Sequence, residues 1–131
     1  MSRSYRFLGA LFIAAILLSG CSKAEWRARV SLFKAEQMFW KTHAQMKSNH
    51  VSFEARQPFY RKACKDYLKA LDLAPRLFNS PRLEEASLSC SNAEDQEATA
   101  KIEQFYTQYC QSHPKECEFG GDMPAGGLEE Y

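Results

Sequence analysis

Four cysteines in the second half of the chain constrain its fold more than any other feature: Cys64, Cys90, Cys110 and Cys117. An even number of cysteines in a small exported domain predicts a disulfide framework, and four of them allow three pairings. Which pairing is possible depends on the secondary structure around them.

Every long segment after residue 22 has the composition of a helix, and no segment alternates as a strand would. Prolines and capping residues mark the breaks between these segments. We therefore expect an all-α fold with helices over residues 23–48, from Ser52 or Pro58 to Ala74, from Ser80 to at least Cys90, and from Asn92 to about Gln111.

The helix boundaries select one disulfide pairing. Cys64 and Cys90 each lie thirteen residues from Leu77, the middle of the turn over residues 75–81. Residues equidistant from the turn of an antiparallel helix hairpin lie level, and both cysteines fall on apolar faces. We expect a Cys64–Cys90 bridge between two helices.

The other two cysteines flank the turn at His113-Pro114, which can fold Cys117 back onto Cys110. We expect a second disulfide there. Cys110, His113 and Cys117 also have the spacing of metal ligands, but they lack a clear fourth ligand and an exported domain oxidises its thiols. We therefore predict no metal site and no cofactor.

The N-terminus has the features of an export signal. Residues 1–6 carry two arginines and no acid, and residues 7–18 form an apolar run of twelve that precedes Ser19 and Gly20. A membrane span needs about 20 apolar residues, so this run is too short to be one. We expect residues 1–20 to be cleaved.

The sequence Leu18-Ser19-Gly20-Cys21 resembles the lipobox of bacterial lipoproteins. The resemblance implies that Cys21 is acylated and begins the mature protein. In an enteric-type host, Ser22 in place of the aspartate of inner-membrane retention implies the periplasmic face of the outer membrane. An ordinary secretory signal or an N-terminal anchor is the alternative.

We expect residues 21–118 to form one helical periplasmic domain, and residues 119–131, which are acidic and rich in glycine, to be a disordered tail. Within the domain, Ala63-x3-Tyr67-x2-Ala70-x4-Pro75 resembles the second helix of a tetratricopeptide repeat. The resemblance implies an array of helical hairpins, and a plain disulfide-stapled bundle is the alternative. Where the repeat's first helix has Trp, Leu, Gly and Tyr, this chain has Lys47, His50, Val51 and Glu54.

The first predicted helix carries two apolar stripes. Trp26, Phe33 and Trp40 recur every seven residues and form one stripe, which we predict to bind a partner. Burial in the domain core and contact with the membrane surface are the alternatives for these aromatic residues. The second stripe, which can attach the helix to the domain, consists of Leu32, Phe39 and Met46.

Charge divides the chain into two halves. Residues 23–69 hold 11 lysines and arginines against 4 acids, and residues 70–131 hold 4 against 12. The basic half could contact anionic lipid, or the two halves could neutralise each other. No nucleic-acid-binding motif accompanies the charge, so we predict no nucleic-acid partner.

No enzyme motif is present: the chain lacks Gly-x-Ser-x-Gly, His-Glu-x-x-His and a phosphate-binding glycine loop. Its histidines, His43, His50 and His113, are dispersed. The sequence therefore predicts a lipid-anchored lipoprotein that is not an enzyme and binds another envelope protein, as an adaptor or assembly factor. The alternatives are an inhibitor or exclusion protein that blocks a partner, and a small-ligand or metal-binding lipoprotein.

The lipobox prediction is tested by Cys21→Ser. Acylation needs the thiol, so the variant should keep its signal sequence or remain without lipid, as intact-mass measurement of the membrane fraction would show. A mature-length, lipid-modified Cys21→Ser chain would contradict the lipobox interpretation.

Overall fold

The computed structural model describes residues 22–117, which form helices and turns without any strand. The expected all-α, disulfide-stapled fold is confirmed. The helices are α2 (Lys23–Trp40), continued by the π-helical turn η1 (Lys41–Met46), α3 (Phe53–Leu73), the short 3-10 turn η2 (Pro75–Leu77), α4 (Ser80–Asn92), α5 (Gln96–Ser112) and α6 (Pro114–Cys117).

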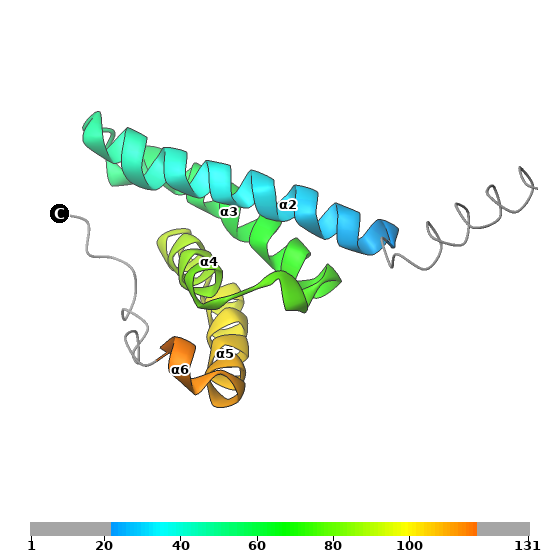
Figure 1. Ribbon diagram of the computed structural model, residues 1–131. Coiled ribbons are helices and arrows are strands. Elements are labelled where there is room, and N and C mark those ends of the chain that lie inside the picture. The colour runs from blue at the N-terminus through cyan, green and yellow to red at the C-terminus, as the bar shows by residue number, and fades with distance from the viewer. Residues whose placement is uncertain (1–21, 118–131) are drawn as a thin grey trace, which may run out of the picture.

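Each helix packs on its neighbours in the chain. In Figure 1, α2 and η1 run antiparallel to α3 as one long hairpin, and α4 and α5 form a second pair below it. The main contacts are those of α2 with α3, α3 with α4, and α4 with α5. Because α2 is the first helix of this series, its side away from α3 and α4 has no helix of the described chain against it.

Side-chain caps begin the four long helices. Ser22 and Ser52 accept hydrogen bonds from the backbone N–H groups three residues ahead and so start α2 and α3. Of the two starts expected for α3, Ser52 is the observed one, and Pro58 lies inside the helix. Asn79 caps α4, one residue before the expected Ser80.

The expected cap at Asn92 is wrong. Asn92 is the last residue of α4, and Asp95 caps α5 instead, with its carboxylate 3.0 Å from the backbone nitrogen of Ala98. Glu94 has a φ of 57°, and the N–H groups of Glu94 and Asp95 bond back to the carbonyls of Ser91 and Cys90. This Schellman ending occupies the residues after Asn92, so the next helix can only begin beyond them.

The core lies where α3 meets its neighbours on both sides. Ala63, Tyr67 and Ala70 of α3 are all fully buried, and the ring of Tyr67 packs against Phe78. The tetratricopeptide-like pattern of these three residues therefore lies in the core. The positions Lys47, His50, Val51 and Glu54 fall across the break between η1 and α3.

Both expected disulfides are confirmed. Cys64 of α3 is bonded to Cys90 of α4, with their Cα atoms 4.8 Å apart, and both residues are buried. Cys110 of α5 is bonded to Cys117 of α6, with Cα atoms 5.7 Å apart. The first bridge joins the two helical hairpins, and the second holds α6 against the end of α5.

Removal of each disulfide should lower the free energy of unfolding by a different amount. Cys64→Ala with Cys90→Ala opens a loop of 26 residues, whereas Cys110→Ala with Cys117→Ala opens one of 7. Loop entropy predicts losses of about 3.5 and about 2.5 kcal/mol respectively. Urea unfolding followed by circular dichroism measures both losses. A larger loss for the Cys110–Cys117 pair would contradict the expectation that Cys64–Cys90, which joins the two helical hairpins, stabilises the domain more.

Candidate docking face on helix α2

The two predicted stripes of α2 lie on different sides of the helix, about 100° apart where their residues are adjacent in the sequence. Leu32 and Phe39 are buried against the domain, and Met46, at the end of η1, is half-buried. The exposed large hydrophobic side chains of the described chain all lie on the other side of α2. They are Trp26, Val30, Phe33 and Trp40, which we call the aromatic face.

The aromatic face is exposed far beyond what packing in a core would allow. The side chains of Trp26, Phe33 and Trp40 are 68%, 59% and 53% exposed. This excludes the core as their location within residues 22–117. Contiguous exposed aromatic side chains are typical of interaction sites, because water around them is released when a partner covers them.

A shallow hollow lies within this face. Its volume is about 480 Å³, and both Phe33 and Trp40, about two helical turns apart, line it. Polar side chains complete its wall, so the hollow has an apolar edge and groups that can donate or accept hydrogen bonds. The residues that line it are Phe33, Glu36, Gln37, Trp40, Lys41 and Gln45.

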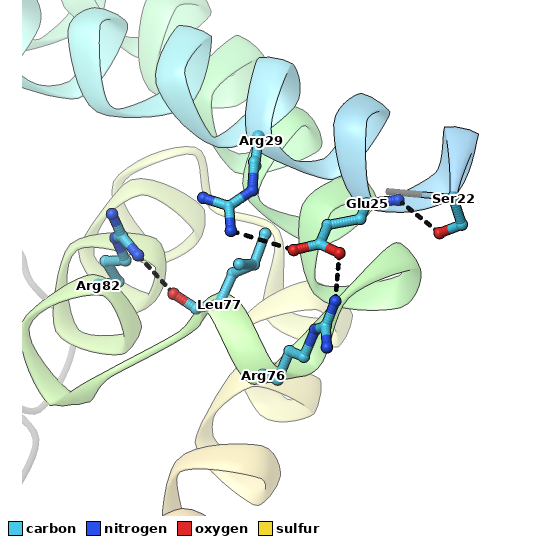
Figure 2. A network of polar contacts seen from close by, with 6 residues as sticks. All are labelled: Ser22, Glu25, Arg29, Arg76, Leu77 and Arg82. Carbon is cyan, nitrogen blue, oxygen red and sulfur yellow. Dashed lines mark hydrogen bonds and ion pairs between the residues drawn. The ribbon is translucent and has the colours of Figure 1, made fainter. Parts of the chain in front are cut away.

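Ion pairs attach one flank of α2 to the turn below it. Figure 2 shows the carboxylate of Glu25 between Arg29 of the same helix and Arg76 of η2, next to the cap at Ser22. The hydrogen bond from Arg29 lowers the pKa of the Glu25 carboxyl, and the charge of Arg76 lowers it further. This end of α2 is therefore held in place from its first turn.

A second ion pair holds the middle of the helix. Arg82 of α4 donates a hydrogen bond from Nε to the carboxylate of Glu36, 2.8 Å away. A terminal nitrogen of Arg82 also donates to the backbone carbonyl of Leu77 (Figure 2). Glu25 and Glu36 therefore interact with arginines of the acidic half of the chain. These pairs join acids of the basic half to bases of the acidic half, so they leave the excess charge of each half unpaired.

The acidic side chains near this flank have structural partners. Tyr67 donates a hydrogen bond to Glu85, 2.9 Å away, in the region between α3 and α4. Burial raises the pKa of the Glu85 carboxyl, and burial together with the charge of Glu85 raises the pKa of Tyr67. The pair is a partly buried hydrogen bond between α3 and α4.

The histidine and cysteine candidates also have structural places. Nδ1 of His43 lies 3.1 Å from the hydroxyl of Tyr60, and its ring stacks on Phe39. The sulfur atoms of Cys110 and Cys117 are bonded to each other, so they are not available as thiolate ligands. No group of three or more His, Cys, Asp or Glu in residues 22–117 is placed to hold a metal ion.

Three of the predicted features lie outside the described residues, and the cleaved signal over residues 1–20 is one of them. Cys21, the predicted acylation site, immediately precedes them, and the predicted disordered tail over residues 119–131 follows them. Among the helices of residues 22–117, none combines the length and apolar character that crossing a bilayer requires.

Sequence reasoning identified the aromatic residues of the face but missed the contacts that orient it. The pairs Glu25–Arg76 and Glu36–Arg82 join residues 51 and 46 positions apart. No local pattern predicts such partners, because only the packing of α2 on the η2 and α4 region brings them together.

Comparisons with known proteins leave the family of the chain open: no protein-family model, curated protein or solved structure matches it. The aromatic face is therefore the feature of the described residues that points to a function.

A pair of adjacent residues tests whether the face is separate from the core. Trp40→Ala should lower stability by less than about 1 kcal/mol, because its side chain is largely in water. Phe39→Ala, its buried neighbour, should cost about 3–5 kcal/mol. Urea unfolding by circular dichroism measures both, and equal losses would place Trp40 in the core.

Proposed function

We propose that this chain is a lipoprotein anchored at the periplasmic face of the outer membrane, and that its helical domain binds another envelope protein as an adaptor or assembly factor. The observation that carries the proposal is the exposed aromatic face of α2. Trp26, Phe33 and Trp40 together present three large rings to water on one helix. Such side chains dominate the energy of protein interfaces when a partner desolvates them.

The attachment of α2 supports a role in binding. The helix is packed along α3 and held by ion pairs at Glu25 and Glu36, so the aromatic rings lie on a rigid element. A preformed face loses little conformational entropy when a partner binds. This favours a docking surface over a segment that folds only on binding.

The proposed anchor would bring this surface close to the membrane. Helix α2 begins two residues after Cys21, so acylation at that position would keep the aromatic face within one helix length of the bilayer. The candidate partners are then proteins of the same membrane and periplasmic proteins that reach it. An adaptor in this position can recruit a periplasmic protein to the membrane surface.

Photo-crosslinking in intact cells tests the proposal. A photoreactive amino acid replaces Gln37, which is exposed on α2 between Phe33 and Trp40, in the full-length protein. The matched control replaces Gln108, which is exposed on α5 away from this face. We expect discrete protein adducts from position 37 and none of the same mass from position 108.

Mass spectrometry of the adducts then decides the outcome. Adducts of position 37 with one or a few envelope proteins support the proposal. Adducts with phospholipid only, with a second copy of the chain only, or no adduct at all would contradict it.

A further inference from the structure

A basic residue follows each ring of the aromatic face. The pairs Trp26-Arg27, Phe33-Lys34 and Trp40-Lys41 recur with a spacing of seven residues. Arg27, Lys34 and Lys41 are all exposed. Since one residue is about 100° of turn, the three cations form a row beside the aromatic face, on its α3 side. We call this the basic row.

The seven-residue spacing is that of a surface on which another helix packs. Val30 and Gln37 lie between the rings, so the face advances along the helix in alternating steps of four and three residues. The same alternation forms the seam along which two helices of a coiled coil pack. The seam is narrow, since it spans only these side chains and is bordered by charged residues on both flanks. A helix buried in a bilayer surface presents a broader apolar face.

The hollow between Phe33 and Trp40 fits the same occupant. In helix packing, a side chain of one helix enters the space between side chains of the other. The hollow of about 480 Å³ is open to solvent on the aromatic face, and Gln37 is among the residues that line it. A flat lipid surface has no matching projection.

The two flanks of the face differ in their charge partners. Glu25 and Glu36 on one flank are paired with arginines of this domain. Within residues 22–117, no ion pair engages the basic row on the other flank, and Arg27 shares a shallow groove with Lys65 and Lys69 of α3. Asp72 also lines this groove but pairs with Lys101, so the basic row is available to acidic groups of whatever covers the aromatic face.

A second copy of the chain does not supply that balance. In an antiparallel pair of α2 helices, the basic row of one copy would face the same row of the other. In a parallel pair, the basic row of one copy would face Arg29 and Glu36 of the other copy. Glu36 already interacts with Arg82 of its own chain. Both arrangements place cations against cations, which is destabilising.

We propose that the aromatic face and the basic row bind an amphipathic helix of the partner protein, with apolar side chains along its seam and acidic side chains opposite Arg27, Lys34 and Lys41. The inference rests on the proposed function, because it names the chemistry of the same docking site. Apolar contacts with the rings provide affinity, and the charged row determines orientation and partner choice.

Two model peptides test the charge rule. Both are 21-residue helices with the same leucine seam and the same composition; one has Glu beside the seam and Lys on the far side, and the other exchanges them. The mature acylated protein is held in phosphatidylcholine vesicles. Both tryptophans of the chain lie on the aromatic face, so a blue shift of their emission reports directly that the face is covered.

We expect the Glu-flanked peptide to bind at least about tenfold more tightly than the Lys-flanked one, a preference that weakens as salt is raised. The triple variant Arg27→Glu, Lys34→Glu, Lys41→Glu should reverse the preference. The control variant Arg61→Glu, Lys101→Glu, Lys115→Glu changes the net charge equally at exposed positions off α2 and should keep it.

Equal binding of the two peptides, no blue shift with either, or reversal by the control variant would overturn the inference. So would a blue shift caused by phosphatidylglycerol vesicles alone, because the bilayer would then cover the face. If position 37 still crosslinks to an envelope protein while the peptides show no preference, the proposed function stands and only the helix and charge rule fails.

Discussion

The place of α2 at the start of the helical series determines the properties of this surface. The helix packs along α3 and meets α4 at few positions, so about half of its circumference has no neighbour within residues 22–117. A helix with one apolar stripe would bury it there and present charges outward. This helix has a second stripe, and Trp26, Phe33 and Trp40 therefore remain in water.

Electrostatic pairing makes the two flanks of α2 unequal. The carboxylates of Glu25 and Glu36 bind arginines of η2 and α4, and these contacts leave the cations of the basic half without acidic partners from α2. The basic row lies on the opposite flank, toward the cations of α3. The internal ion pairs thus use up the acidic groups of α2 and leave a surface that complements an acidic partner.

The disulfides allow so small a domain to hold this surface rigidly. Cys64–Cys90 joins the hairpin that carries the aromatic face to the pair α4 and α5, and it is buried in the core. Constraint of the unfolded chain compensates for the limited apolar area that a domain of this size can bury. Stability then does not require the aromatic residues of α2 to enter the core.

The sequence by itself determined the helices, both disulfide pairs and the two stripes of α2, because helix periodicity and the distance of each cysteine from a proline-marked turn are local properties. It could not decide which stripe faces water, since either could have filled the core. The sequence also misplaced the N-cap of α5 at Asn92. Asn92 is the last residue of α4, and because Glu94 takes a positive φ in the turn that follows, Asp95 caps α5 instead. The exposure of Trp40 and the pairing of Glu36 with Arg82 follow from tertiary structure alone, because they depend on how distant helices pack.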